Sequence, residues 1–347
     1  MTLTRTPSRD RMPGRLTRRA LLGAAATAGL APRAAIAQGA ASAGEIRFAH
    51  AFGETVLPGP ARRVVSLGFT TQDTLIALGT PPVALRSWFG DQPNGIWPWA
   101  RPLAGDAAPV MIAGEVAMET VAALQPDLIV GIGSGISEAE YAILSQIAPT
   151  LMQAPGRAAY GTPFDELTAT LGRALGRDAE AADLVARTKR LFAHARRRHP
   201  DWAGRTGVAA YHFGGETGAF SAHDTRGAFL AELGFAPRPE ITRLAGDTFF
   251  TGLSPEDLSP LDGDLLLWIS SFDAAPDLAA LPMRKLLAAH QAGREVFAGA
   301  LTAAALSFGS VLSLPFALSQ LEGEIALALD GDPATPVPSA VTAGLSP

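Results

Sequence analysis

The sequence predicts an α/β fold of two lobes, each with a mixed or parallel sheet flanked by helices, joined by one long bridging α-helix. Three observations lead to this prediction. The 347 residues are enough for two domains of roughly 150 residues each. Short strands rich in β-branched residues alternate with helices in both halves of the chain. Between the halves, residues 178–199 carry a helical spacing of apolar residues, long enough to span about 33 Å.

The first lobe is predicted to cover residues 44–177. Ser137 and Glu140 have the spacing of a capping box, and Gly79 and Gly176 are typical of helix C-termini. The loop 88–101 is rich in aromatic residues, Pro and Gly. The pattern predicts a hairpin over 45–58, strands over 63–67, 83–85, 127–131 and 150–153, and helices over 71–78, 118–124, 137–147 and 164–175.

The second lobe is predicted to cover residues 200–330, after Pro200 ends the bridging helix. The three arginines 196–198 lie in the last turn of that helix, where cations complement the helix dipole. The tail, 331–347, is rich in Pro, Thr, Ser and Gly and is expected to be mobile. Within the lobe we expect strands over 206–211, 264–269 and 294–297, and helices over 226–233, 254–258, 283–290 and 311–329.

The first 43 residues have the pattern of an export signal rather than of a folded segment. Six arginines precede an apolar stretch that is too short to span a bilayer, and small residues mark cleavage near 37 or 43. The pair Arg18 and Arg19 resembles a twin-arginine signal. No cysteine follows, so no lipid anchor is expected. We therefore predict an exported, periplasmic protein, most simply a monomer.

Composition excludes several function classes. The chain has no cysteine, which excludes disulfides, thiolate metal sites and cysteine nucleophiles. Removing the basic leader, 1–37, from totals of 28 basic and 33 acidic residues leaves a net charge of −11. A nucleic-acid-binding protein would show a basic domain or stripe instead.

Several segments occur in an order and spacing that carry a family resemblance. The most specific is 119–129, with the sequence ETVAALQPDLI. The others are 50–55, 60–65, 72–73, 77–79, 144–150, 254–258 before 264–268, and 307–315. Together they resemble the periplasmic substrate-binding proteins of ABC importers, in the iron-siderophore, cobalamin and haem class with a single bridging helix. The aromatic loop and the segment 307–315 look most like the iron-siderophore branch.

This resemblance implies a carrier without enzymatic activity or intrinsic cofactor. It would capture a ferric siderophore between its lobes and deliver it to an ABC permease with its ATPase subunits. In the family, matching glutamates on the two lobes pair with permease arginines, which here implies Glu119 and Glu256. Each is also an ordinary acid at a predicted helix start. Glu115 and Asp257 are nearby alternatives.

The candidate ligand contacts are aromatic residues, two arginines and a serine. Aromatic rings suit the apolar body of a chelate, and guanidinium groups bind oxygen anions. The tryptophans could equally form a local loop core, and the arginines could be surface charges. The candidates are Arg86, Trp88, Phe89, Trp97, Ser134, Tyr160, Arg226, Phe250, Phe272 and Phe308.

One departure from the family pattern bears on the charge of the ligand. Many siderophore-binding relatives carry a basic residue just before the helix of Glu119, whereas this chain has Gly114, Glu115 and Val116 there. This favours a neutral or weakly charged chelate such as a ferric hydroxamate. Haem, cobalamin or a bare metal ion remain alternatives, as does a metal-dependent periplasmic hydrolase. A metal site for the last two would use His212, Glu216, His223 and Asp224.

Overall fold

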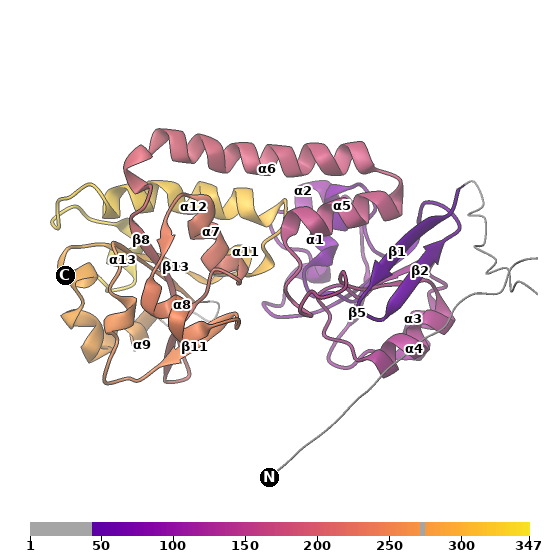
Figure 1. Ribbon diagram of the computed structural model, residues 1–347, viewed down its shortest axis with the longest axis horizontal. Helices are drawn as coiled ribbons and strands as arrows, with labels where there is room; N and C mark the ends of the chain where they lie inside the picture. Colours follow the sequence, from indigo (N-terminus) through magenta and orange to yellow (C-terminus); the bar gives the residue numbers. More distant parts are fainter. Residues whose placement is uncertain (1–43, 271–274) are drawn as a thin grey trace, which may run out of the picture. The chain divides into compact units, whose positions relative to one another are not determined.

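The computed structural model describes residues 44–270 and 275–347, which belong to one compact unit. They form two α/β lobes bridged by helix α6 (Asp178–Arg198), as the sequence predicts (Figure 1). The predicted export signal with Arg18 and Arg19, and the candidate contact Phe272, lie outside the described residues.

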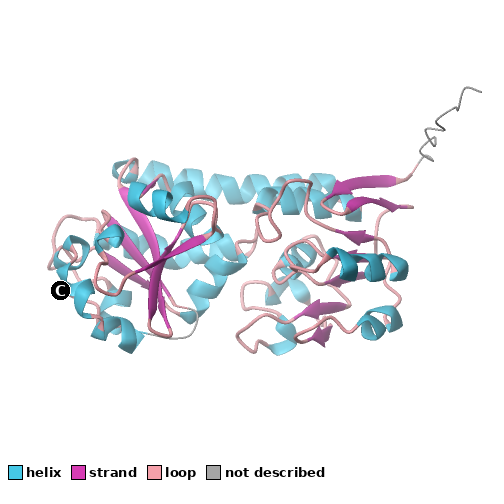
Figure 2. Cartoon of the chain, turned by 60° about the horizontal axis from the view of Figure 1, so that its bottom comes forward, coloured by secondary structure: helices cyan, strands magenta, loops and turns pink. Residues whose placement is uncertain are grey.

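The first lobe contains a parallel sheet in the order β5-β4-β3-β6-β7, counted over the described residues (Figure 2). A separate antiparallel hairpin precedes it, formed by β1 (Ile46–His50) and β2 (Gly53–Leu57). The two central strands are fully buried apolar runs, as is typical of a sheet covered on both faces. The strands are β3 (Val64–Ser66), β4 (Ala84–Arg86), β5 (Val110–Ile112), β6 (Leu128–Val130) and β7 (Thr150–Leu151).

Side chains that alternate along β3 and β6 separate the two helical layers of this lobe. Val64 and Leu128 point toward α1, α5 and the hairpin, whereas Val65 and Ile129 point toward α3 and α4. The predicted capping box of α4 is confirmed, as is the left-handed Gly176 at the end of α5. The helices are α1 (Thr71–Ala77), α2 (Arg101–Ala104), α3 (Met118–Ala123), α4 (Glu138–Ile147) and α5 (Phe164–Leu175), with a 3₁₀ turn η1 (Pro93–Gly95).

The bridging helix α6 packs against α5 of the first lobe and α12 of the second (Figure 1). Its buried stripe consists of Ala181, Thr188, Phe192 and Ala195. The helix ends one residue before the predicted boundary at 199, and a 3₁₀ turn η2 (Pro200–Trp202) follows. One helix therefore contacts both lobes.

The second lobe contains a mixed sheet in the order β11-β9-β8-β12-β13, with β10 beside β8, again counted over the described residues. Strands β8, β12 and β13 are parallel, and β9 runs antiparallel to β8 and β11. The strands are β8 (Thr206–Phe213), β9 (Glu216–Phe220), β10 (Ala236–Pro237), β11 (Phe250–Leu253), β12 (Leu265–Ile269) and β13 (Glu295–Ala298).

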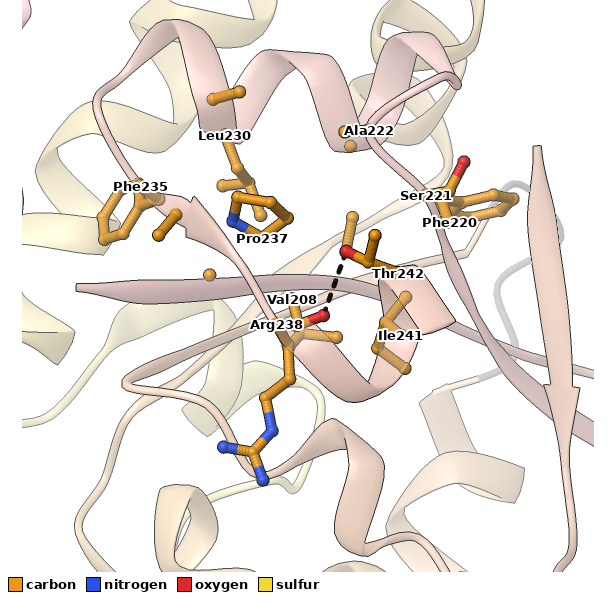
Figure 3. Close-up of a pocket in the computed structure, with 15 residues that line it drawn as sticks. Val208, Phe220, Ser221, Ala222, Leu230, Phe235, Pro237, Arg238, Ile241 and Thr242 are labelled. Carbon is orange, nitrogen blue, oxygen red and sulfur yellow. Dashed lines mark hydrogen bonds between the residues drawn. The ribbon is translucent and has the colours of Figure 1, made fainter. Parts of the chain in front are cut away.

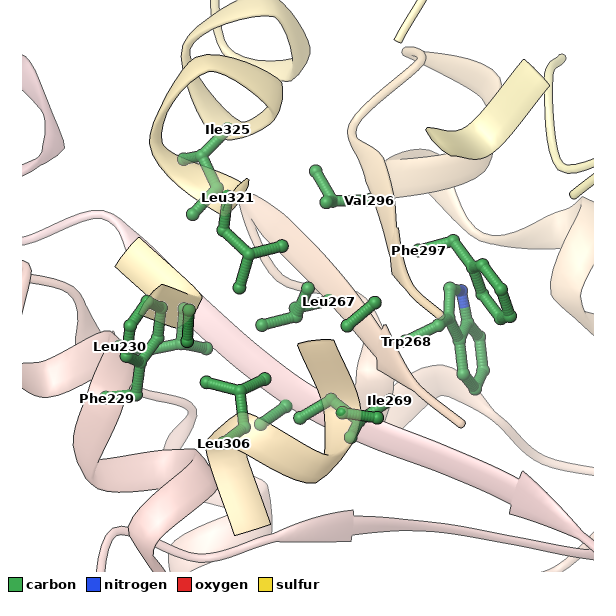
Figure 4. Close-up of a cluster of buried hydrophobic side chains, with 14 of the residues drawn as sticks. Phe229, Leu230, Leu267, Trp268, Ile269, Val296, Phe297, Leu306, Leu321 and Ile325 are labelled. Atoms are coloured by element: carbon green, nitrogen blue, oxygen red, sulfur yellow. The ribbon is translucent and has the colours of Figure 1, made fainter. Parts of the chain in front are cut away.

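The core of this lobe forms where β12 is covered by helices. Figure 4 shows Leu321 and Ile325 of α12, and Leu306 of α11, packed over Leu267, while Trp268 points to the opposite face. The helices are α7 (Thr225–Glu232), α8 (Pro239–Ala245), α9 (Ala275–Ala280), α10 (Ala288–Gln291), α11 (Ala300–Phe308), α12 (Ser313–Ala328) and α13 (Pro338–Thr342), with 3₁₀ turns η3 (Ser259–Leu261) and η4 (Pro282–Leu286).

Three predicted helices of the second lobe are wrong or misplaced. Residues 254–258, predicted as a helix start, form a turn in which the Asp257 N–H donates to the Ser254 carbonyl. The segment 283–290 is broken at Leu287, which is extended, so that η4 and α10 are separate. The helix predicted over 311–329 is α12, which starts at Ser313 after the additional helix α11.

The tail after residue 330 differs from the expected mobile segment. It forms α13, which packs on β13, and Val337, Ala340 and Leu345 are buried in the core. Ser339 also receives a hydrogen bond from the Phe297 backbone N–H at 3.1 Å. The physical reason is that apolar residues in this Pro- and Ser-rich segment find an uncovered edge of the lobe.

Candidate functional site

A pocket of about 340 Å³ opens between the two lobes. Ligand sites favour such positions, and this volume lies in the range typical of small-molecule sites. We call it the interlobe pocket. Its lining residues are Phe69, Thr70, Thr71, Trp88, Ile132, Gly133, Tyr160, Thr162, Phe164, Leu167, Asp224, Thr225, Arg226, Phe249, Phe250, Ser307, Phe308 and Gly309.

The first-lobe wall is built from loops that follow sheet strands. Phe69 comes three residues after β3, and Ile132 and Gly133 come directly after β6. Since β3 and β6 are parallel neighbours, their carboxyl ends meet at one edge, where α/β sheets commonly bind ligands.

Trp88 is the most prominent aromatic residue of this wall. Its side chain is 45% exposed, although its ring contacts three other rings. The ring centroids lie 5.7 Å from Phe69, 4.7 Å from Phe89 and 5.9 Å from Phe308. Trp88 therefore presents a free ring face at the pocket from a position supported by other aromatic residues.

The second-lobe wall holds the charged residues of the pocket, Asp224 and Arg226. The guanidinium of Arg226 donates two hydrogen bonds to the Asp224 carboxylate, at 2.6 and 2.7 Å. It also lies 3.6 Å from the centroid of the Phe220 ring. Because Asp224 additionally caps α7 through the Arg226 N–H, the pair is held rigidly and its charges cancel.

Other predicted residues also line the pocket. Tyr160 and Phe250 are both more than half exposed and stand at the rim, where Gly135 leaves space for the Tyr160 hydroxyl. Phe308, only 4% exposed, forms the floor. It is held in edge contacts with Trp97 and Trp99, whose rings stack on each other at 5.0 Å.

Four predicted contacts do not line the interlobe pocket. Arg86 lies over the Phe69 ring and donates hydrogen bonds to the Gly114 and Ser134 carbonyls, so it supports the wall from behind. Ser134 is buried and donates to the Gly131 carbonyl within its own turn. Phe89 and Trp97 pack in the aromatic loop, as the loop-core alternative expected.

A second hollow, the side pocket, is lined in part by Trp88 and has a volume of about 320 Å³. Trp88 and Phe308 line both pockets. The side-pocket residues are Gln72, Leu85, Arg86, Ser87, Trp88, Phe89, Asp91, Gln92, Gly95, Trp97, Met111 and Phe308.

A third cavity lies inside the second lobe, between β8 and α7 (Figure 3). It measures about 20 Å³, which is room for a single water molecule. Thr242 closes one side and donates a hydrogen bond to the Arg238 carbonyl at 3.3 Å. This cavity is too small for a chelate.

A buried carboxyl group, Asp73, links the lobes beneath the aromatic loop. Its Oδ2 accepts hydrogen bonds from Trp99 Nε1 and from the Ser310 hydroxyl of the second lobe, both at 2.7 Å. Burial raises the pKa of Asp73 to about 7, against the lowering effect of these two hydrogen bonds. The Oδ1 atom has no hydrogen-bond partner among the described residues.

The two glutamates predicted to contact a permease are both exposed. Glu119 lies in the first turn of α3, as expected. Glu256 lies on the turn before η3 rather than at a helix start, which corrects its predicted setting. Glu115 is also exposed, and hydrogen bonds from Ser259 lower the pKa of Asp257.

Sequence reasoning missed several lining residues, namely Phe69, the hydroxyl residues Thr70, Thr162, Thr225 and Ser307, and Phe249. Phe69 carried a usable signal, because it follows the carboxyl end of the buried strand β3. Ser307 also carried a signal, because it opens the segment 307–315 that resembles the iron-siderophore branch, whereas the threonines carried none.

The structure also bears on metal binding and on membrane insertion. Across residues 44–270 and 275–347, no three His, Asp or Glu side chains are close enough to hold a metal ion. His212 Nδ1 instead lies 2.8 Å from the Thr217 hydroxyl. No helix in the same two ranges has the length and apolar character to cross a bilayer.

Comparisons with known proteins identify the family. A comparison with curated proteins gives no match. A solved periplasmic solute-binding protein from Mycobacterium smegmatis is 32% identical, with a TM-score of 0.74 over 83% of this chain and 100% of its own. Streptococcus pneumoniae PiaA in complex with ferrichrome is 20% identical (TM-score 0.70; 83% and 99% covered). Staphylococcus aureus SirA complexed with staphyloferrin B is 21% identical (TM-score 0.67; 82% and 98% covered).

The family model described as periplasmic binding protein matches residues 64–295, which cover most of both lobes and all of the bridging helix. The two-lobed fold and the pocket between the lobes agree with this match. The chain therefore belongs to the periplasmic binding protein family.

Proposed function

We propose that this protein captures a ferric siderophore in the interlobe pocket and delivers it to an ABC permease. The observation that carries the proposal is a pocket between the lobes, lined by aromatic rings and hydroxyl groups from both of them. Family membership supports a carrier role, and two structures of the same fold were solved with ferrichrome and with staphyloferrin B.

The charge of the pocket favours a neutral chelate. Asp224 and Arg226 are its charged lining residues among those described, and they neutralise each other. Three hydroxamates balance the charge of Fe³⁺, whereas three catecholates leave a net charge of −3. Releasing Arg226 to bind such an anion would leave Asp224, itself only 7% exposed, without its partner. We therefore propose ferric hydroxamates as the ligand class.

The construction of the pocket supports binding with little rearrangement. One helix joins the lobes, which restricts hinge motion compared with flexible connecting strands. The aromatic wall is braced by ring contacts among its own side chains. A preformed site loses less conformational entropy on binding, so more of the contact energy contributes to affinity.

A titration tests the proposal directly. Isothermal titration calorimetry with ferrichrome, a ferric tricatecholate, haem and cobalamin should give saturable, one-to-one binding with the hydroxamate and at least about tenfold weaker binding with the others. Tight stoichiometric zinc in the purified protein, or saturable binding of haem or cobalamin alone, would replace this function with an alternative one.

We propose further that exposed Glu119 and Glu256 dock on the permease. Charge reversal, Glu119→Lys or Glu256→Lys, should abolish uptake in cells while leaving the Kd for ferrichrome unchanged, because neither residue lines the pocket. Glu54→Lys, an exposed acid on the hairpin, is the matched control and should leave uptake intact. Lost ferrichrome affinity in the docking variants would contradict this assignment.

The leader supports export, which we propose follows the twin-arginine route into the periplasm. The proposal rests on Arg18 and Arg19 and on the apolar stretch after them. Mass spectrometry of the protein recovered from the periplasm should give a chain starting near residue 38 or 44. Recovery of the intact leader there would argue against cleavage.

A further inference from the structure

The interlobe pocket and the side pocket are neighbours that share Trp88 and Phe308 as lining residues. The two volumes, about 340 and 320 Å³, are nearly equal. A ligand larger than the first pocket would therefore find additional room behind these two rings.

The two shared rings differ in how firmly they are held. Phe308 is 4% exposed and packs among Trp97, Trp99 and Phe89. Trp88 is 45% exposed, although its ring contacts Phe69, Phe89 and Phe308. Of the two rings that separate the pockets, Trp88 is therefore the one that can be removed without opening the core.

The side pocket can accept part of a ligand chemically. Asp91, Gln92 and Ser87 supply polar groups, and Met111 and Leu85 supply apolar surface. Asp91 is exposed and forms no ion pair among the described residues. The pocket therefore suits an amide- or hydroxyl-bearing arm of a chelate rather than its iron centre.

We propose that Trp88 is a specificity-determining residue that sets the upper size limit of the chelate by closing the side pocket. This inference rests on the proposed siderophore-binding function. With the indole in place, a compact ferric hydroxamate fills the interlobe pocket, and a bulky arm meets the ring. When the indole is removed, the two pockets become one, and the arm is accommodated.

The surrounding loop retains its structure without the indole. Its backbone is positioned by Trp97, which is buried, stacks on Trp99 and lies against Gly90, where the backbone has a φ of 87°. Truncation of a half-exposed ring leaves these contacts in place. The effect of a Trp88 variant on ligand choice is then separable from an effect on folding.

The experiment measures two Kd values by calorimetry for each protein. The ligands are ferrichrome and a ferrichrome derivative bearing a naphthyl amide on its peptide ring. The native protein should bind the derivative at least about tenfold more weakly than ferrichrome. Trp88→Ala should bring this ratio to about one, while ferrichrome itself binds a few-fold more weakly through loss of the ring contact. Trp88→Leu, which retains an apolar side chain, should give an intermediate ratio.

Phe250→Ala is the matched control, because Phe250 is 56% exposed and lines the interlobe pocket but not the side pocket. It should weaken both ligands equally and leave their ratio unchanged. Equal ratios in the native protein and both Trp88 variants, with ferrichrome still bound, would overturn the role of Trp88 alone. Absence of binding by the native protein would overturn the siderophore-binding function, and this inference with it.

Discussion

Asp73 makes stability depend on pH in a direction opposite to that of most paired carboxylates. Its carboxyl group is 1% exposed, accepts hydrogen bonds from Trp99 and Ser310, and forms no ion pair among the described residues. Replacing it with asparagine, Asp73→Asn, keeps an acceptor oxygen for both donors and removes the ionisation. The free energy of unfolding should therefore fall with rising pH in the native protein but not in the variant.

The size of this change in the free energy of unfolding follows from the pKa of Asp73. Burial raises the pKa of Asp73 from 3.8 to about 7. Between these values the unfolded chain releases a proton that the native state still holds, so the free energy of unfolding falls with increasing pH. Ionisation of Asp73 therefore does not affect the free energy of unfolding below about pH 4 and lowers it by about 4 kcal/mol above pH 7. From pH 5 to pH 8 the native protein should lose about 2.5 kcal/mol relative to the variant.

Urea unfolding followed by circular dichroism, at half-unit steps from pH 5 to pH 8.5, measures this difference. The asparagine Nδ2 takes the place of the unpartnered Oδ1, and an unsatisfied donor costs about 1–3 kcal/mol. The variant should thus be the more stable protein at pH 8 by about 1–3 kcal/mol and lose that advantage at pH 5. Asp91→Asn, an exposed control, should follow the native curve. Native and Asp73→Asn curves that stay parallel across this range would refute the reasoning.

Two further predictions concern the tail and the buried ion pair beneath it. Leu345→Ala should lower the free energy of unfolding by about 2–5 kcal/mol, because the leucine is 1% exposed, whereas the exposed Val341→Ala should change it by less than about 0.5 kcal/mol. Equal, small effects in urea unfolding would mean that the tail does not pack. Glu295→Gln leaves the buried guanidinium of Arg284 without its carboxylate and should cost about 3–5 kcal/mol. The same change at surface Glu54 should cost less than about 1 kcal/mol, and a comparable loss there would undo the argument from burial.

Local sequence determined the elements whose stabilising contacts lie within a few residues. The capping box of α4 needs only Ser137 and Glu140, and the end of α5 needs only a residue that accepts a left-handed conformation, Gly176. The fully buried strands β3 and β6 were predictable from their apolar runs. The long run of helically spaced apolar residues in α6 predicted the helix that bridges the lobes.

Distant contacts decided what the local pattern could not. The break between η4 and α10 occurs where the Asp262 carboxylate accepts the N–H groups of Ala288 and Ala289, from a loop 26 residues earlier. The apolar packing of the tail is joined by a hydrogen bond from Arg284 to the Leu345 carbonyl, across 61 residues. Neither partner is recognisable from the segment it stabilises.

The candidate site divides in the same way. The sequence predicted ligand contacts for aromatic residues of the loop 88–101, because their types suit a chelate, and the family resemblance predicted one for Phe308. Only the tertiary structure separated Trp88, which faces the pocket, from Trp97, which is buried against Trp99 and Phe308. It likewise paired Arg226 with Asp224 and turned Arg86 toward backbone carbonyls. A residue's type limits the contacts that it can make. Which of these contacts it does make depends on the distant segment that folding brings beside it.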